Sequence, residues 1–320
     1  MAVVKLSTSG LSNFAKYSSM LAGNAKFRLP GVAGYSAGGD APSNPTSTVN
    51  KFAFPSDSRS TLGTGLSAAM TDLAAFSNVG VAGYAAGGDN AGGSEVDTVD
   101  KFAFPSDSRS TLGTGLSAVR RHLEGFQNSG VAGYAAGGLA AGGALVSTVD
   151  KFAFPSDSQS TLGAGLSSDR RFPSGMSNVG VAGYAAGGLE SSSVSTVDKF
   201  AFPSDSRTTL GTGLSSARLG AIGMSNSGIA GYAAGGSTGS SVTTVDKFAF
   251  PSDSRTTLGT GLSNSRALGA GFSNSGVAGY AAGGGNTTVD KFNFSNDSRS
   301  TLATGLSADT SNLAGFEDAA

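Results

Sequence analysis

The sequence predicts an all-β protein, a six-bladed β-propeller built from four-stranded antiparallel blades. The motif GVAGYAAGG recurs with single-residue changes, and its tyrosines are spaced by 48 to 50 residues: Tyr35, Tyr84, Tyr134, Tyr184, Tyr232 and Tyr280. Each unit holds four short segments rich in valine, phenylalanine, tyrosine and threonine, separated by turn residues, and helical spacing is absent. Four strands in about 50 residues, repeated six times, are typical of a propeller.

The unit at residues 122–166 shows the four segments in order. Segment A is HLEGF, segment B is VAGYAAGG, segment C is STVDKFAF and segment D is QSTLGAGL. The nearly constant turns QNSG and PSDS connect A to B and C to D, whereas variable loops connect B to C and D to the next A. In segment C, Phe102 and Phe104 alternate with Val99 and Ala103, so both faces carry apolar groups. This pattern is expected for a blade packed between two neighbours, with the glycines and alanines of A and B near a crowded axis.

The repeat predicts a single domain over the whole chain. The expected parts are an extra strand and lead-in at 1–19, six repeats of about 44–50 residues at 20–307, and a closing strand at 308–320. The alternative fold is a β-solenoid, whose coils are usually shorter and need no hairpin turn such as PSDS. VVKLSTSGLS at 3–12 resembles segment D and NLAGF at 312–316 resembles segment A. We expect terminal strands to close the ring; the alternative is that a surplus strand pairs with a neighbouring subunit and makes a homo-oligomer.

Composition excludes several classes of protein. Of 320 residues, 50 are glycine, 13% are charged, and the net charge is −1, so a large nucleic-acid interface is not expected. There is no cysteine, which excludes disulfides and thiolate metal sites. The sequence has neither a convincing signal peptide nor the roughly 20 consecutive apolar residues of a membrane span. We therefore expect a soluble protein made in the cytoplasm, without membrane insertion and without a cofactor.

The order of motifs resembles the kelch repeat. An apolar run ending in Gly-Gly (VAGYAAGG) is followed by a variable gap, an aromatic in the next strand (Phe102), a turn and a further strand, over nearly the whole chain. The chain departs from the family in lacking its tryptophan, near Leu112 and Leu162, and in having phenylalanine for tyrosine in the third strand. The low charge, near-identical units and Ser/Gly/Thr-rich surface also resemble kelch-like proteins encoded by tailed bacteriophages of aquatic bacteria.

The variation between units collects on one predicted face. In an up-and-down blade the B–C and D–A loops share one end of the sheet, and these are the segments that differ in length and content. The A–B and C–D turns share the other end and hardly vary. A uniform framework with variable loops is typical of a binding face. The alternative is neutral drift of loops that little packing constrains.

Basic residues repeat within the variable D–A loops. Arg120, Arg170, Arg218 and Arg266 hold the same place in four units, and Arg121 and Arg171 double two of them. A ring of guanidinium groups there would bind carboxylates, sulfates or phosphates. The alternative is that each arginine binds a backbone carbonyl at its blade entrance. The candidate ligand-binding face is completed by four acidic loop residues: Asp89, Glu95, Asp97 and Glu190.

Other polar residues favour architecture over chemistry. Asp100 and Lys101 recur in mid-strand, so we expect the aspartate of one blade to pair with the lysine of the next, with a gap where unit one has Asn50. No metal site is expected, because GGDNAGGSEVD lacks the spacing of a calcium loop. The single histidine, His122, is expected at the surface, and no Ser-His-Asp set stands out. A carboxylate pair for sugar cleavage stays open.

These features predict a non-enzymatic phage virion protein, a tail-fibre or receptor-binding propeller. Its expected partner is a host cell-surface glycan, bound by the face of B–C and D–A loops. The first alternative is a structural virion component, a capsid decoration or tail assembly subunit whose partners are other virion proteins. The second is a cellular kelch-type protein-interaction module.

Overall fold

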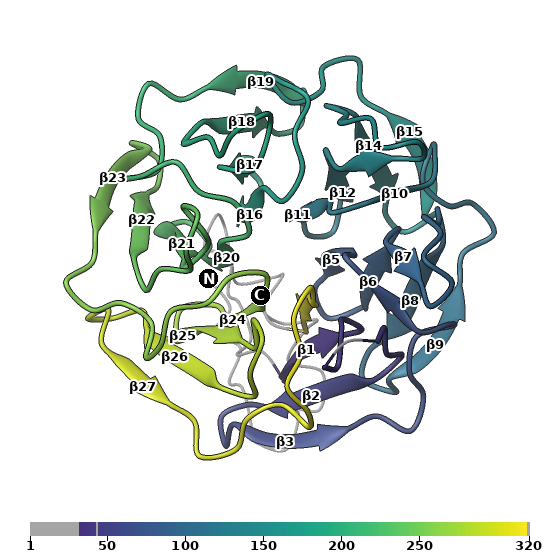
Figure 1. Ribbon diagram of the computed structural model, residues 1–320, viewed down its shortest axis with the longest axis horizontal. Helices are drawn as coiled ribbons and strands as arrows, with labels where there is room; N and C mark the ends of the chain where they lie inside the picture. Colours follow the sequence, from purple (N-terminus) through teal and green to yellow (C-terminus); the bar gives the residue numbers. More distant parts are fainter. Residues whose placement is uncertain (1–31, 43, 319–320) are drawn as a thin grey trace, which may run out of the picture.

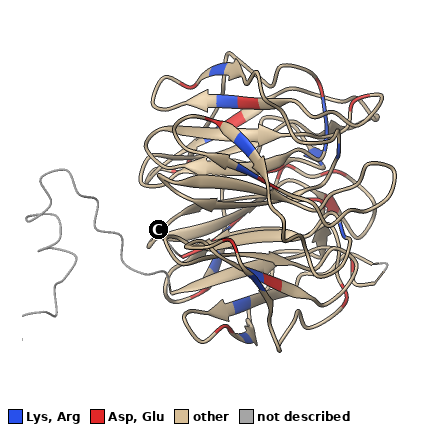
Figure 2. Ribbon diagram, turned by 90° about the vertical axis from the view of Figure 1, so that its left-hand side faces the viewer, with Lys and Arg blue, Asp and Glu red and all other residues tan. Residues whose placement is uncertain are grey.

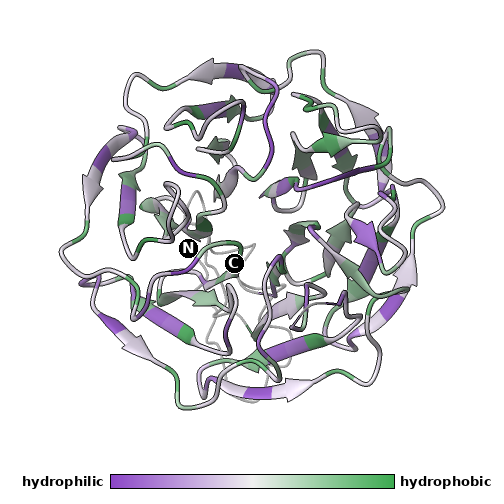
Figure 3. Cartoon of the chain, in the orientation of Figure 1, coloured by the Kyte–Doolittle hydropathy of each residue, from purple (hydrophilic) through white to green (hydrophobic). Residues whose placement is uncertain are grey.

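Six four-stranded antiparallel sheets stand in a ring around a central axis (Figure 1). The computed structural model describes residues 32–42 and 44–318, and this part of the chain contains no helix. The predicted fold class is confirmed: the protein is a six-bladed β-propeller. Figure 3 shows hydrophobic residues mainly in the inner strands and hydrophilic ones mainly in the outer strands and loops.

The strands of each blade run from the axis outwards in the order A, B, C, D. Blade 1 has β28 (Ala314–Glu317), β1 (Ala33–Ala37), β2 (Val49–Ala53) and β3 (Ser58–Thr61); blade 2 has β5 (Ala74–Asn78), β6 (Ala82–Ala86), β8 (Val99–Ala103) and β9 (Ser108–Thr111); blade 3 has β11 (Glu124–Asn128), β12 (Ala132–Ala136), β14 (Val149–Ala153) and β15 (Ser158–Thr161). Blade 4 has β16 (Ser174–Asn178), β17 (Ala182–Ala186), β18 (Val197–Ala201) and β19 (Ser206–Thr209); blade 5 has β20 (Ile222–Asn226), β21 (Ala230–Ala234), β22 (Val245–Ala249) and β23 (Ser254–Thr257); blade 6 has β24 (Ala270–Asn274), β25 (Ala278–Ala282), β26 (Val289–Asn293) and β27 (Arg299–Thr301).

The strand bounds differ from the expected segments at both edges of the blade. Segment A was expected at 122–126, but β11 begins at Glu124, because residues 122 and 123 turn around the axis before the strand starts. Segment D is shorter than expected, since β15 ends at Thr161. Beyond it the chain leaves the sheet edge, and the Leu166 amide donates to the Ser147 carbonyl in the loop before segment C.

The hydrophobic core consists of six clusters, each lying between two neighbouring blades. In one, Tyr134 is fully buried and stacks on Phe126 of its own blade, with ring centroids 4.9 Å apart, and on Phe202 of the next, 5.4 Å away. Phe126 also covers Gly183 of the next blade, where a Cβ would lie 2.1 Å from its ring. Blades therefore share their aromatic side chains, and stacking of this kind adds about 0.5–1.5 kcal/mol per pair to the burial itself.

The backbones at the axis approach as closely as the glycine-rich segments predict. A Cβ on Gly125 would lie 1.7 Å from the Ala75 carbonyl oxygen, and one on Gly175 would lie 1.9 Å from that of Gly125. The second residue of strand A must therefore be very small, and five of the six units have glycine there. The prediction of a crowded axis is confirmed.

A ring of polar contacts joins each blade to the next. The lysine and the buried tyrosine of one blade both bind the aspartate in the PSDS-type turn of its neighbour, as Lys151 and Tyr134 bind Asp205 at 2.5 and 2.7 Å. The six lysine pairs are Lys51–Asp107, Lys101–Asp157, Lys151–Asp205, Lys199–Asp253, Lys247–Asp297 and Lys291–Asp57. The predicted ring of lysine–aspartate pairs between blades exists, but the predicted aspartate was wrong. The lysine binds the aspartate of the PSDS-type turn and not the mid-strand aspartate, so Asn50 at the mid-strand position of blade 1 leaves no gap.

Replacement of one turn aspartate tests this ring. Asp205 has φ 55°, which asparagine also tolerates, so Asp205→Asn keeps the backbone and removes the charge. We expect a loss of about 1–2 kcal/mol in the free energy of unfolding, because the ammonium of Lys151 and hydroxyl of Tyr134 lose a charged acceptor. Urea unfolding of the variant and the unmodified chain measures this difference in the free energy of unfolding. The control is Asp309→Asn, which changes an exposed acid on a D–A loop. Equal losses of stability in Asp205→Asn and Asp309→Asn would contradict the role of Asp205 in joining neighbouring blades.

The C-terminal strand closes the ring. β28 pairs with β1, and Phe316 lies opposite Tyr35 in the register, with ring centroids 5.0 Å apart. The expectation that a terminal strand completes a blade is confirmed at this end. The other segment singled out, at 3–12, lies outside the described residues, as does the lead-in at 1–19.

Candidate functional site

The B–C and D–A loops lie together at one end of the blades, as expected. Two of these loop pairs form short ladders, in which β4 (Met70–Thr71) pairs with β7 (Asp89–Asn90) and β10 (Arg120–Arg121) pairs with β13 (Leu139–Ala140). The end of the propeller that carries these variable loops is called here the loop face. Charged residues are sparse over the whole ring (Figure 2).

The four repeated arginines are not ligand-binding residues of this face. Arg120, Arg170, Arg218 and Arg266 are at most 1% exposed, and each binds the mid-strand aspartate of its own blade at 2.8–3.0 Å: Asp150, Asp198, Asp246 and Asp290. Each also donates to a segment B carbonyl, as Arg120 does to Ala135 at 3.1 Å. The predicted ring of accessible guanidinium groups is wrong, because each guanidinium is buried against an aspartate that lies 24–30 residues further along the chain. The alternative, an arginine bound to a backbone carbonyl at the blade entrance, describes what is found.

Three of the buried aspartates, Asp198, Asp246 and Asp290, are held in their charged form. Burial alone would raise the pKa of Asp198, but the Ser167 amide, the Thr209 hydroxyl and the charge of Arg170 together hold that pKa below its usual value. The pKa values of Asp246 and Asp290 are lowered in the same way. Blade 1 has Asn50 and Thr310 in place of the aspartate and the arginine, so both charges are absent together there.

The other predicted site residues are spread over the loop face. Arg121 forms an ion pair with Asp89 and lies 3.7 Å from Glu95. Arg171 lies over the ring of Phe172, 5.4 Å from its centroid. In the remaining loops, Glu190 accepts a hydrogen bond from Ser168, and Asp97 is exposed. The structure brings Arg121, Asp89 and Glu95 together and leaves the others apart.

A second ring lies at the axis on the loop face, at a position that the sequence analysis did not single out. Six equivalent residues, called here the mouth residues, are joined by a closed circle of backbone hydrogen bonds from the amide of each to the carbonyl of the preceding one, at 2.6–3.1 Å. They are Asp72, His122, Phe172, Gly220, Leu268 and Asn312. All six have left-handed φ between 55° and 61°.

This left-handed conformation is costly for most of the side chains present. It costs roughly 1–2 kcal/mol for a residue with a Cβ, and only glycine adopts it freely. Gly220 is therefore the residue that suits the position best, yet five units keep a side chain there. The mouth position lies within the variable D–A loops and holds a different residue in each of the six units. Backbone strain and a set of six different side chains at one point of the axis indicate a functional site.

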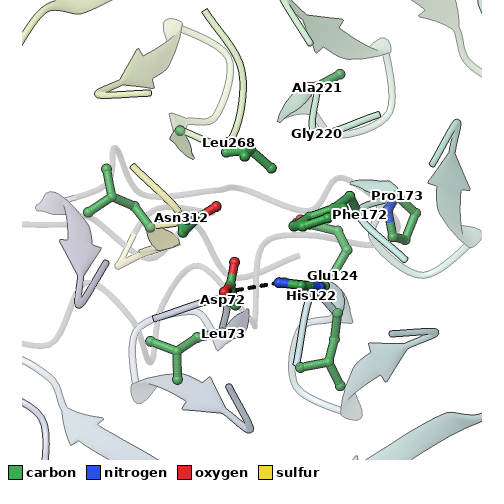
Figure 4. Close-up of a pocket in the computed structure, with 13 residues that line it drawn as sticks. Asp72, Leu73, His122, Glu124, Phe172, Pro173, Gly220, Ala221, Leu268 and Asn312 are labelled. Atoms are coloured by element: carbon green, nitrogen blue, oxygen red, sulfur yellow. Dashed lines mark ion pairs between the residues drawn. The ribbon is translucent and has the colours of Figure 1, made fainter. Parts of the chain in front are cut away.

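The mouth residues surround a small open pocket (Figure 4). The Nε2 of His122 lies 3.1 Å from a carboxylate oxygen of Asp72, and its ring stacks on Phe172 with centroids 4.0 Å apart. Across the opening, Asn312 donates to Asp40 at 2.8 Å. Two buried atoms at this pocket, Nδ1 of His122 and Oδ1 of Asn312, have no hydrogen-bond partner among the described residues. His122 is thus half-buried beside an acid and an aromatic ring, and the expectation of a surface histidine was wrong.

The axis continues inward as a narrow channel lined by the inner strands. Its polar residues include Glu124, Gln127 and Glu317, and Gln127 donates to Glu317 at 2.7 Å. Partial burial raises the pKa of Glu124 to about 8 and that of Glu317 to about 7, although hydrogen bonds to both carboxyl groups lower these pKa values. Glu124 lines both the channel and the mouth pocket, so it forms the floor of the pocket.

The linings show what the site can do chemically. The residues that line the mouth pocket offer an aromatic platform, an imidazole, a carboxylate and an amide, but no hydroxyl, thiol or primary amine as a nucleophile. Among residues 32–42 and 44–318, no group of three or more histidine and carboxylate side chains is arranged to hold a metal ion. The same part of the chain has no apolar helix of membrane-spanning length.

Comparisons with known proteins agree with the architecture. No protein-family model matches the chain, and no curated protein matches it. A solved structure titled "Structure of YjhT" is similar with a TM-score of 0.65 at 14% identity, over 86% of this chain and 98% of that one. At this identity the similarity shows the fold alone. The class of protein is thus a β-propeller, and the kelch-type repeat stays an interpretation of the sequence.

Proposed function

We propose that this chain is a non-enzymatic binding propeller that recognises a glycan in the mouth pocket on its loop face. The observation that carries the proposal is the mouth position itself, where six different residues share left-handed backbone around one pocket at the axis of the loop face. The pocket opens on the loop face, where the residues that line it can contact one side of a sugar ring. The stacked pair of Phe172 and His122 provides an apolar face, and Asp72 and Asn312 provide hydrogen-bonding groups.

The biological setting that we propose is a phage virion, as a tail-fibre or receptor-binding protein attached to a host surface glycan. It is supported by the low charge, the near-identical units and the Ser/Gly/Thr-rich surface of the sequence. These resemble kelch-like proteins of tailed bacteriophages. In this setting the loop face points toward the host cell and the opposite face toward the particle.

One observation favours an assembly role for the opposite face. All the large apolar side chains that are strongly exposed in the described residues occupy one equivalent position, directly after the A–B turn: Val32, Val81, Val131, Val181, Ile229 and Val277, 44–56% exposed. Six aliphatic side chains in a ring, without free charges among them, suit contact with another virion protein. The second candidate function is therefore a structural virion component, and it is compatible with binding by the loop face.

A substitution at Phe172 tests the glycan site. Phe172→Asn removes the aromatic face and places a residue that tolerates left-handed φ, so the ring should fold as well as before. We expect affinity for a ligand found on a glycan array to fall at least 10-fold, since truncation of a central aromatic contact commonly costs more than about 1.4 kcal/mol. Isothermal titration calorimetry measures the affinity, and chromatography of the ligand after incubation detects any turnover.

The matched control is Val181→Ser, an exposed change on the opposite face of the same blade. It should leave glycan affinity unchanged. Equal affinity of Phe172→Asn and the unmodified chain would reject the mouth pocket as the site. Release of a cleaved or altered sugar would reject the non-enzymatic part of the proposal. Loss of binding to virion components in Val181→Ser alone would assign assembly to the opposite face.

A further inference from the structure

The mouth pocket and the channel below it are acidic. Their linings contain the carboxyl groups of Asp72, Glu124 and Glu317, whereas no lysine or arginine is among the residues that line either space. The one basic side chain, His122, is paired with Asp72. Arg120, Arg170, Arg218 and Arg266 do not alter this balance, because each is buried against its own aspartate. Arg121 is paired with Asp89, and the guanidinium of Arg171 lies over the Phe172 ring outside both linings. The site therefore suits a ligand with a positive group better than an anionic one.

Glu124 is the carboxyl group in the best place to meet such a ligand. It is the first residue of β11, and the other five blades have alanine, serine or isoleucine at this position. Its side chain crosses to the next blade, where the Cβ that Gly175 lacks would lie 3.0 Å from the Glu124 Cγ. The amides of Gly125 and Gly175 donate to its carboxyl group. The carboxyl is thus fixed at the floor of the mouth pocket, below Phe172 and His122.

The surroundings of Glu124 favour a cationic partner. No salt bridge joins Glu124 to a cation of the described residues, and burial raises the pKa of its carboxyl group to about 8. An ammonium group within hydrogen-bonding distance would stabilise the carboxylate form. The resulting charge-assisted hydrogen bond in a site shielded from water is among the stronger polar contacts available to a protein.

We propose that the mouth pocket selects an amino sugar, whose ring lies against Phe172 and His122 while its ammonium group donates to Glu124. This inference rests on the glycan-binding function proposed above and names the class of glycan. It reverses the expectation from the sequence, in which a ring of arginines would bind carboxylates, sulfates or phosphates. The reversal follows from the burial of those arginines and from the acidic lining of the axis.

Matched pairs of sugars test the proposal with the full-length chain. The probes are the methyl glycosides of glucosamine, galactosamine and mannosamine, together with their N-acetylated forms, titrated calorimetrically at pH 6. At least one amino sugar should bind 10-fold or more tightly than its acetylated form. Glu124→Gln should remove this preference, so that the amino sugar binds no more tightly than its acetylated form. Asp309→Asn, which removes an exposed carboxylate of a D–A loop outside both linings, is the matched control and should keep the preference.

Proton release gives an independent readout. Because the ligand arrives as an ammonium and Glu124 is protonated in the empty site, formation of the ion pair should release about one proton per sugar bound. Titrations in two buffers with different heats of ionisation count that proton, and the Glu124→Gln protein should release none. Binding of amino sugar without proton release in the unmodified protein would overturn the role of Glu124.

The remaining outcomes separate this inference from the function on which it rests. Equal or tighter binding of the acetylated forms would overturn amino-sugar selection and leave glycan binding standing. Competition by ethanolamine as strongly as by the amino sugars would also overturn it, because the site would then recognise an ammonium without a sugar ring. Absence of binding to these probes and to a full glycan array would overturn both proposals.

Discussion

Phe316→Ala is expected to lower the free energy of unfolding by about 4 kcal/mol, the typical cost of removing a fully buried phenylalanine. Phe316 is 1% exposed and belongs to β28, the C-terminal strand that closes the ring. Its ring lies 5.0 Å from that of Tyr35 and 5.6 Å from that of Phe102 in the next blade, so it joins blades 1 and 2. Denaturant unfolding followed by circular dichroism measures the change.

The matched control for closure is Phe126→Ala. Phe126 holds the equivalent place in blade 3, is also 1% exposed, and also stacks on a tyrosine of its own blade and a phenylalanine of the next. Unlike β28, its strand β11 is joined to the next strand of its blade by a turn. Both variants should lose similar stability. In Phe316→Ala, amide hydrogen exchange should become faster in β28 and β1 than in the other strands. The reason is that β28 is not joined to β1 by a turn, so it can detach from the blade on its own. The same exchange pattern in both variants would contradict the expectation that β28 is the strand that detaches most easily.

Asp290→Asn is expected to cost about 3–4 kcal/mol, because it leaves the fully buried guanidinium of Arg266 without its counter-charge. Arg266→Met should cost less, since the Ser263 amide and hydroxyl and the Thr301 hydroxyl still hold Asp290. The other blades agree with this order of stability losses. Blade 2 has Met70 at the arginine position and keeps the aspartate Asp100, whereas each of the four repeated arginines is paired with an aspartate.

The double variant Arg266→Thr/Asp290→Asn copies blade 1, with its Thr310 and Asn50. It should recover most of the stability lost in Asp290→Asn, and chemical denaturation of the single and double variants gives the coupling energy. Additive losses would show that the pair does not act as a unit. Because the folded pKa of Asp290 lies below its unfolded value, its contribution is complete above about pH 4 and is lost as the pH falls through the folded pKa.

Much of the fold could be predicted from the sequence, because a propeller repeats its constraints in every unit. The spacing of Tyr35 and its equivalents gave the blade number, and the glycines of segment A reflect the crowded axis that Gly125 demonstrates. NLAGF at 312–316 predicted closure because it carries the segment A pattern, including the phenylalanine that fills the gap between blades.

The site was harder to predict because its geometry depends on contacts between distant residues. Arg120 resembles a surface ligand-binding residue until the fold places Asp150 beside it, 30 residues away in the sequence. The aspartate of PSDS, such as Asp205, resembles an ordinary turn residue, and only the neighbouring blade supplies its lysine. One signal for the mouth residues was available: two residues after each arginine position stands a residue that differs in all six units. Without the left-handed backbone of His122 and its equivalents, that signal could not be separated from loop drift.

The most direct measurement is a crystal structure of the chain with the tightest ligand from a glycan array. The ligand should lie at the axis on the loop face, with its ring against Phe172 and His122 and within hydrogen-bonding distance of Asp72 or Asn312. A ligand bound among the outer loops, on the opposite face beside Val131, or between blades would contradict the central claim that the mouth pocket is the binding site.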